Sequence, residues 1–393
     1  MSSDKKLLSD FATVISGYAF KSEWFGTGND KVIRIGDLQE GSIQTEAALT
    51  VDASQYKISD NFKIQNKDIL MALSGATVGK IAVASDADVG SYINQRVAII
   101  RAKDEITADY LKFFFSGEFL DDLLKNAGGA AQPNLSPKQL LLMEIPFPPL
   151  AEQRRIASIL DQADELRQKR QLAIKKLDQL LQAEFISKFH QKNYPEFKVS
   201  NLLENDKSMR TGPFGSQLLH SEFVEEGIHV LGIDNAVQNS FNWAKPRFIT
   251  EKKYKDLKRY TVKPKDVIIT IMGTCGKCAV VPDDIPKAIN TKHLCCITLD
   301  QNKCNPEFLH SYFLLHPTAR NYLESRAKGA IMSGLNMGII KELPVELPPI
   351  EMQNEFSKLK QKVILQKTLM IEELSKLNEL FQSLQNQAFS GTL

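Results

Sequence analysis

The chain has 393 residues, of which 43% are hydrophobic and 24% charged, and its formal net charge at neutral pH is +2. This composition is typical of a globular protein with room for two domains, and it excludes a disordered chain, a collagen-like chain and a polycation. No run approaches the roughly eighteen apolar residues of a membrane span, and the polar pair Ser9-Asp10 interrupts the apolar run near the N-terminus, so we expect no signal peptide and a cytoplasmic location.

The first domain is predicted to comprise residues 1–145 and to fold as α+β. Short runs rich in β-branched and apolar residues predict strands at 32–35, 64–73, 81–84 and 95–100. A helical period follows over 109–124 and includes three consecutive phenylalanines. Because the strands come first and the helix later, a doubly wound parallel sheet is not expected.

A long helix is predicted next, from Pro148 to Phe189. Two prolines and the acidic Glu152 are typical of a helix start, and no Gly or Pro interrupts the stretch from there to Phe189. Apolar residues recur at heptad spacing, at Ile159, Ala163, Leu166, Ala173, Leu177 and Leu180, with breaks at Arg170 and Glu184. Such a helix is roughly 60 Å long, which is too long for one small domain to cover, so it requires a long partner.

The partner is predicted to lie in the same chain, since the pattern returns 200 residues later. Leu347-Pro348-Pro349-Ile350 repeats Phe147-Pro148-Pro149-Leu150, and Gln353 repeats Gln153. The apolar register recurs at Leu359, Val363, Leu377, Leu380 and Phe389. We therefore expect two long helices packed as an antiparallel coiled coil about a pseudo-two-fold axis. The alternative is two unrelated amphipathic helices.

The second domain, residues 193–343, echoes the first. Residues 209–216 parallel 15–22, the Gly276-Lys277 turn parallels Gly79-Lys80, residues 289–292 parallel 93–96, and the loop at 329–336 parallels that at 128–135. The predicted organisation is a domain (1–145), a helical spacer (146–192), a similar domain (193–343) and a second helical spacer (344–393).

All five cysteines lie in the second half of the chain. Cys275 and Cys278 form a C-x-x-C motif, but the following pair, Cys295-Cys296, is adjacent, which does not fit a zinc ribbon. The matching first-half positions are apolar, namely Val78, Ile81 and the Ala98-Ile99 pair. The cysteines are therefore interpreted as small core residues.

The motifs of catalysis are missing. The Gly-rich turn ending at Lys80 is too short for a Walker motif, and Ile81 stands where Mg²⁺ binding needs Ser or Thr. Phe147 and Leu150 flank the first Pro-Pro pair, where an amino-methyltransferase loop has a polar residue and an aromatic residue. No metalloprotease-type histidine pair is present. We predict no catalytic residue and no metal site.

The whole chain resembles the specificity subunit of type I restriction-modification systems. The resemblance is carried by the segment from Ile145 to Ile156, the loop from Gly129 to Leu135, and the opening Gly212-Pro213-Phe214-Gly215-Ser216 of the second domain. The second helix start departs from the family pattern, because Glu351-Met352-Gln353-Asn354-Glu355 lacks the Glu-Gln-Arg-Arg run.

The resemblance implies a non-catalytic DNA reader. Each target-recognition domain would read one half of an asymmetric bipartite site on double-stranded DNA. The two helices would set the spacer and bind two modification subunits, which bring S-adenosylmethionine. Restriction subunits would bring ATP- and Mg²⁺-dependent translocation and cleavage. The alternatives are a helical scaffold or interaction protein without DNA specificity, and a self-contained methyltransferase or nuclease.

Candidate DNA contacts are Lys21, Arg34, Lys80 and Arg96 in the first domain, and Arg210, Gln217, Lys277, Lys292, His293, Arg326 and Lys328 in the second. Arg and Lys can read guanine or hold phosphate, and Gln can read adenine. Candidate partner contacts at the helix starts are Glu152, Gln153, Arg154, Arg155 and Gln353. The alternative for each charged residue is a solvated surface charge.

Overall fold

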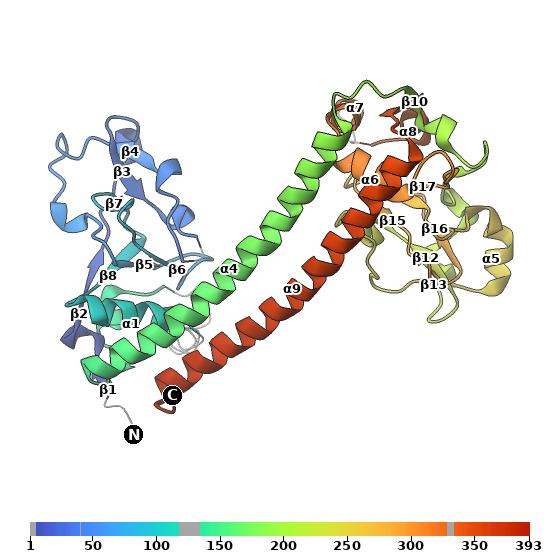
Figure 1. Ribbon diagram of the computed structural model, residues 1–393. Helices are drawn as coiled ribbons and strands as arrows, with labels where there is room; N and C mark the ends of the chain where they lie inside the picture. Colours follow the sequence, from blue (N-terminus) through green and yellow to red (C-terminus); the bar gives the residue numbers. More distant parts are fainter. Residues whose placement is uncertain (1–4, 40, 118–133, 328–333) are drawn as a thin grey trace. The chain divides into compact units, whose positions relative to one another are not determined.

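The computed structural model describes residues 5–39, 41–117, 134–327 and 334–393 (Figure 1). The chain divides into two compact units, Met1–Leu172 together with Ile371–Leu393, and Ala173–Met370. Each unit contains about one half of each long helix. None of the described helices combines the length and the hydrophobicity that a membrane crossing requires.

The first unit is built on two small sheets. The larger is antiparallel, in the order β2 (Ala12–Ser16), β8 (Val97–Ala102), β5 (Ile69–Ala72) and β6 (Ile81–Val83). The smaller has the order β4 (Leu49–Val51), β3 (Asp30–Ile33) and β7 (Tyr92–Ile93), with β3 parallel to β7. A two-stranded pair joins β1 (Lys5–Leu7) to β9 (Glu144–Pro146), and the described helices before the long one are α1 (Glu105–Phe115) and α3 (Pro137–Leu141).

Side chains of the larger sheet alternate between two cores, as the two-residue period of a strand requires. Ile69 and Met71 pack in the cluster that contains the α1 phenylalanines, whereas Leu70 and Ala72 pack in a cluster with Ile33 of the smaller sheet. The sheet is therefore buried on both faces, which explains why β5 is a continuous apolar run. The predicted α+β class is confirmed, and the part of the predicted helix beyond residue 117 lies outside the described residues.

The second unit repeats this plan strand for strand. Its larger sheet has the order β11 (Met209–Thr211), β17 (Leu294–Ile297), β14 (Val267–Thr270) and β15 (Cys278–Val280). Its smaller sheet has the order β13 (Phe248–Ile249), β12 (Ile228–Leu231) and β16 (Ala288–Asn290), and β10 (Glu196–Lys198) pairs with β18 (Pro344–Glu346). Its helices are α5 (Glu251–Leu257), α6 (Pro306–Leu315), α7 (Pro317–Ala327) and α8 (Met337–Lys341). The predicted duplication is confirmed.

The structural match between the copies differs by one residue from the sequence match in two places. Thr211 occupies in β11 the place that Ser16 occupies in β2, so Gly212 matches Gly17, not Tyr18 as the sequence match has it. The carbonyl of Arg96 accepts a hydrogen bond from the end of β5, and the carbonyl of His293 accepts the equivalent bond from the end of β14. His293, not Lys292, is therefore the counterpart of Arg96.

The two long helices are α4 (Leu150–Phe189) and α9 (Ile350–Ser390), and both begin directly after the Pro-Pro pairs, as predicted. In the first unit, Arg167 contacts Asn378 and Arg170 contacts Glu373. In the second unit, Asp178 pairs with Lys367, and Phe185 packs on Phe356. As residue numbers rise along α4 they fall along α9, so the helices pack antiparallel in each unit, which confirms the predicted pairing.

The predicted seam between these helices was partly wrong. Leu166, Leu180 and Leu380 were assigned to it, yet their side chains are 54%, 48% and 51% exposed. One inward position near the middle is instead Arg167, whose guanidinium lies 4.3 Å over the ring of Phe381. Arg170, predicted as a polar break in the seam, does face α9, where it pairs with Glu373. The aliphatic part of an arginine side chain can lie along apolar surface while its guanidinium finds a partner. An arginine can therefore occupy an inward position where a heptad pattern predicts leucine.

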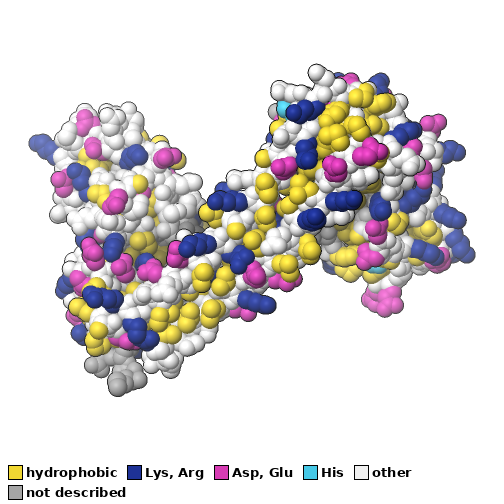
Figure 2. All heavy atoms as spheres, in the orientation of Figure 1, with side chains coloured by type: hydrophobic (Ala, Val, Ile, Leu, Met, Phe, Trp, Pro, Cys, Tyr) yellow, Lys and Arg dark blue, Asp and Glu magenta, His cyan; other side chains and the backbone are white. Residues whose placement is uncertain are grey.

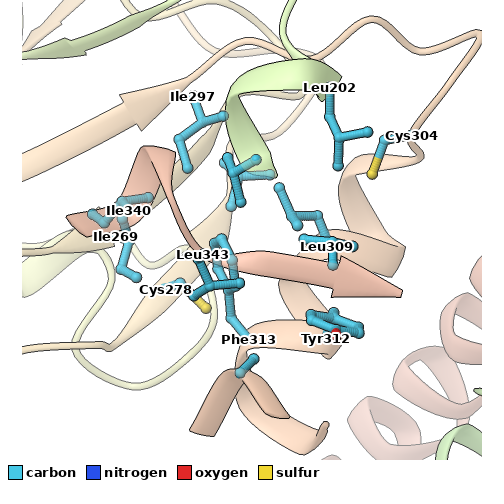
Figure 3. Close-up of a cluster of buried hydrophobic side chains, with 14 of the residues drawn as sticks. Leu202, Ile269, Cys278, Ile297, Cys304, Leu309, Tyr312, Phe313, Ile340 and Leu343 are labelled. Atoms are coloured by element: carbon cyan, nitrogen blue, oxygen red, sulfur yellow. The ribbon is translucent and has the colours of Figure 1, made fainter. Parts of the chain in front are cut away.

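Four of the five cysteines are core residues, as predicted, and Cys275 is partly buried against the same core. Cys278, Cys295, Cys296 and Cys304 are buried, and Figure 3 shows Cys278 and Cys304 among the aliphatic and aromatic side chains of the second unit. Burial raises the pKa of the Cys278 and Cys295 thiols to about 12. Such thiols stay protonated at neutral pH and pack as small apolar groups.

Candidate nucleic-acid interface

Each unit has one edge where two parallel strands of the smaller sheet end together, and we call it the strand-end edge. In the first unit, Arg34 follows β3 and Arg96 follows shortly after β7. Parallel strands bring their carboxyl ends to the same edge, so these two arginines lie on neighbouring chain segments. The backbone N–H of Leu73, at the end of β5, donates to the carbonyl of Arg96 at 2.9 Å. This bond brings the glycine turn that precedes Lys80 to the same edge.

The glycine turn packs against the residues that follow β3. Gly75 has a φ of +88°, and a Cβ built on it would lie 4.0 Å from Ile35. This backbone conformation favours glycine and leaves the turn open to close approach. Lys80 follows the turn and is half-buried, whereas Arg96 is exposed. Within the described part of the chain, neither has an ion-pair partner, so both charges are available to a ligand.

Arg34 is held differently, since it has a carboxylate beside it. Its Nε lies 3.4 Å from Oδ2 of Asp37, and the same oxygen accepts a hydrogen bond of 2.8 Å from the Arg34 backbone N–H. The Asp37 side chain is 10% exposed and the Arg34 side chain 41%. The carboxylate therefore orients the guanidinium from the protein side and leaves its outer edge in solvent.

The second unit has the same edge with different side chains. Gly232 follows β12, and Lys292 and His293 follow β16. The hydrogen bond of Thr270 N–H to the Lys277 carbonyl repeats that of Ala72 to Lys80, so the two turn lysines occupy equivalent places. Burial, with the positive charges of Lys292 and Arg247 adding to it, lowers the pKa of His293, so its imidazole is neutral at pH 7.

Arg247, which sequence reasoning missed, completes this edge. Gly232 is the counterpart of Arg34, because the N–H of each residue donates to an Asx side chain three residues on, Asp37 or Asn235. A Cβ built on Gly232 would lie 2.4 Å from Nη2 of Arg247. A guanidinium thus stands at the edge in both units, but in the second it comes from the residue before β13. A residue-by-residue match of the repeats cannot find such a replacement.

Arg210 was a predicted DNA contact, and the structure contradicts this. Its side chain is 12% exposed and its Nη2 lies 2.6 Å from Oδ2 of the fully buried Asp266. Its remaining N–H groups donate to the carbonyls of Ser208 and Thr261 and to the hydroxyl of Thr298. With its donors committed inside the unit, Arg210 is a structural residue. In the first unit, Arg101 from β8 makes the equivalent pair with Asp68.

Three other candidates are exposed and lie on other elements. Lys21 has its ammonium 5.5 Å over the ring of Trp24, and Arg326 on α7 has its guanidinium 5.0 Å over Tyr322. The side-chain oxygen of Gln217 accepts a hydrogen bond from the hydroxyl of Tyr260 at 2.8 Å. Lys328 lies outside the described residues. The structure therefore gathers Arg34, Lys80 and Arg96 in one unit, and Lys277, Lys292 and His293 in the other.

At the helix starts, Gln153 and Gln353 are fully buried, which contradicts their assignment as partner contacts. The amide N–H₂ of Gln153 donates to the Pro148 carbonyl, and its oxygen accepts from the hydroxyl of Thr107. The amide of Gln353 bridges the carbonyls of Pro348 and Lys303, and its oxygen accepts from the N–H of Asn305. Both glutamines fix where the long helix leaves its domain.

The other helix-start candidates stay at the surface. Glu152 and Arg155 form an ion pair at 2.7 Å, with both side chains between 40% and 46% exposed. Arg154 is exposed, and it lines a groove of about 600 Å³ between α1 and α4 in the first unit. The acidic residues Asp109, Asp161, Asp164 and Glu165 also line this groove.

Exposed leucines stand on both long helices. In the first unit they include Leu166 and Leu380, and in the second Leu180, Leu365 and Leu369. Figure 2 shows hydrophobic side chains at the surface over these helices. Solvated helix faces normally carry polar residues, so these leucines are an unusual feature of the surface of the long helices.

Comparison with known proteins gives one consistent result. A family model described as "Type I restriction modification DNA specificity domain" matches residues 3–176 and 222–381. The chain is similar to the EcoBI specificity subunit of Escherichia coli, with 24% identity over 98% of this chain and 85% of that protein. It is also similar to the MjaVIII specificity subunit of Methanocaldococcus jannaschii, with 23% identity over 82% and 83% of the two chains.

Two solved structures share the fold. One comes from a study of complex assembly and conformational transition of the type I R-M system, with a TM-score of 0.61 and 16% identity over 99% of this chain and 98% of that one. The other is the S subunit of a type I restriction-modification system from M. genitalium, with a TM-score of 0.57 and 16% identity over 98% and 96% of the chains.

Proposed function

Because this chain belongs to the family of type I restriction-modification DNA specificity subunits, which is non-catalytic, we propose that each of its repeated domains reads one half of a bipartite, asymmetric DNA site. The proposed target-recognition domains are residues 1–145 and 193–343, and the proposed spacers are residues 146–192 and 344–393. The complex would act in the cytoplasm, where its DNA substrate lies.

The proposal is supported by the strand-end edge, which occurs in both units with the same backbone arrangement but with different side chains. Lys80 and Lys277 occupy equivalent places beside an open glycine turn, whereas Arg96 is replaced by His293. Contacts to phosphate position a protein on DNA, and contacts to base edges specify sequence. Lysines kept at the same backbone position suit the first role, and the side chains that differ suit the second. Two target-recognition domains with such edges would read two different half-sites.

We propose that α4 and α9 set the spacing between half-sites and bind two modification subunits through the exposed leucines. S-adenosylmethionine would be bound by those subunits, and ATP and Mg²⁺ by restriction subunits. Glu152, Arg154 and Arg155 remain candidate contacts at the first helix start.

The docking surface is testable on α9. Leu365 and Leu369 lie one helical turn apart on one face, while the exposed Ser375 of the same helix points about 100° away from that face. We expect Leu365→Glu with Leu369→Glu to weaken binding of the purified modification subunit about tenfold or more by calorimetry, because two apolar contacts are lost and two charges must be desolvated. Ser375→Glu, the control, should bind normally. Equal loss in both variants, or in neither, would contradict this assignment.

The function is tested by methylome sequencing of cells that carry the chain with its cognate modification subunits. A bipartite motif with two different halves is expected, and Lys80→Ala with Lys277→Ala should lower methylation at all sites alike. Random methylation or none would favour a helical scaffold. Methyl transfer by the purified chain alone, with labelled S-adenosylmethionine, would favour a self-contained methyltransferase.

A further inference from the structure

The second unit keeps a guanidinium at its strand-end edge although it has lost the matching arginine. In the first unit Arg34 follows β3, and in the second Gly232 stands in its place. Nη2 of Arg247 lies 2.4 Å from where the missing Cβ would be, so a side chain on residue 232 would displace it. The absence of a side chain at position 232 therefore makes the room that Arg247 occupies.

Each of these arginines is paired with an aspartate of the short turn that follows the strand. Arg34 pairs with Asp37 of the turn Ile35–Asp37, and Arg247 pairs with Asp234 of the turn Ile233–Asn235 at 2.5 Å. The aspartates stand at different positions in their turns, so both members of the pair have changed place while the pair itself persists. A surface charge without a role has no reason to be rebuilt in this way.

These pairs differ from the buried pairs that support the larger sheets. Asp68 and Asp266 are almost completely buried, and Arg210 has no donor left for a ligand. The side chains of Arg34 and Arg247 are instead 41% and 34% exposed. Unlike Arg210, both arginines therefore keep guanidinium surface that a ligand can reach, and an aspartate orients each of them.

The neighbouring aspartate decides between phosphate and base. A carboxylate beside a guanidinium repels phosphate and cancels much of the attraction that a point charge would supply. It also fixes the plane of the guanidinium, which suits the paired O6 and N7 acceptors of guanine in the major groove. Lys80, Lys277 and Lys292, which have no such carboxylate in the described structure, suit phosphate. At each edge, the lysines are therefore suited to bind DNA phosphates, and the arginine is suited to bind a base.

On the premise of the proposed function, we propose that Arg34 and Arg247 each read a guanine, one in each half-site, and that Asp37 and Asp234 position them. The recognition site then contains at least one G·C pair in each half. Arg247 is a specificity-determining residue, and Asp234 is a positioning residue.

The test is methylome sequencing of cells carrying single variants with the cognate modification subunits. Arg247→Lys keeps the charge but loses the paired N–H donors of the guanidinium. One guanine position of one half-site should therefore become degenerate, and the preference for guanine over the other bases there should fall about 5- to 150-fold. Arg34→Lys should do the same in the other half only. Asp234→Asn should relax the same position as Arg247→Lys while overall methylation persists, a pattern that a purely structural role would not give.

The matched control is Arg320→Lys, since Arg320 is an exposed arginine on α7 that also pairs with an acidic residue, Glu324, at 3.7 Å. The methylated DNA motif of the Arg320→Lys variant should be the same as that of the wild type. Thermal melts of each purified complex show whether a variant still folds. A wild-type bipartite motif that lacks guanine in a half-site, or that Arg247→Lys leaves intact, overturns this inference alone. A wild-type methylome with no bipartite motif overturns the proposed function.

Discussion

At the scale of single residues, the two arginine pairs of the second unit should contribute very differently to stability. Arg210→Ala leaves the buried Asp266 without its cation, and losing one partner of a buried pair costs about 3–5 kcal/mol. Arg247→Ala breaks a pair whose members are 34% and 40% exposed, and such surface pairs are worth about 0–1 kcal/mol. Denaturant unfolding of both purified variants measures the difference. Similar losses would mean that Arg210 is not the structural residue described above.

His310 predicts a loss of stability in mild acid. Its Nε2 lies 3.0 Å from the Asn239 carbonyl and 3.1 Å from that of Cys278, and Nδ1 lies 2.7 Å from Nζ of Lys360. The imidazole is therefore neutral, with its proton on Nε2. Burial, together with the charge of Lys360, lowers the pKa of His310 from 6.5 to about 4.

Since the unfolded chain binds this proton first, the His310 contribution to the free energy of unfolding is complete above pH 6.5 and falls as the pH drops toward 4. His310→Gln removes the titration but keeps a side-chain donor. The difference in unfolding free energy between wild type and this variant should therefore shrink between pH 6.5 and 4, by denaturant titration at each pH. Parallel curves would contradict the assignment.

At the scale of elements, the start of each long helix depends on one buried glutamine. Gln353→Met would leave two carbonyls and one N–H without a partner, and each unsatisfied buried group costs about 1–3 kcal/mol. Gln153→Met would orphan only the Pro148 carbonyl, because the Thr107 hydroxyl keeps its hydrogen bond to Asp104, so this variant should be destabilised less. Denaturant unfolding compares the two. Unchanged stability with weakened binding of the modification subunit would restore the glutamines as partner contacts.

The same scale shows what the sequence could and could not predict. The helix starts at Leu150 and Ile350 were predictable, because Pro-Pro and an acidic first turn are local signals. The seam register was not, because Leu166 and Arg167 are adjacent and only the partner helix decides which points inward. Arg210 was mistaken for a DNA contact because its partner, Asp266, lies 56 residues further along the chain, directly before β14. Arg247 was missed because it takes the place of Arg34 but comes from a different part of the repeat, directly before β13.

At the scale of the whole molecule, the prediction concerns the two helices as a ruler. Both α4 and α9 run from one unit into the other, α4 past Leu172 and α9 past Met370. Lengthening α4 alone would leave α9 short, so the change must be made in both. One heptad added after Leu172 and one after Met370 keeps the seam in phase and adds about 10 Å, the length of about three base pairs.

With these insertions, the permitted spacer of the methylated motif should change while both half-sites stay the same, because a new spacer must match both the added length and the turn of about 34° per base pair of DNA. Adding four residues at each place is the matched control, because it turns one half of each helix by about 40° relative to the other. That control should reduce methylation without giving a new defined spacer. If the heptad insertions yield full methylation at the original spacing, the half-site separation is set by the target-recognition domains or by the modification subunits and not by the length of α4 and α9.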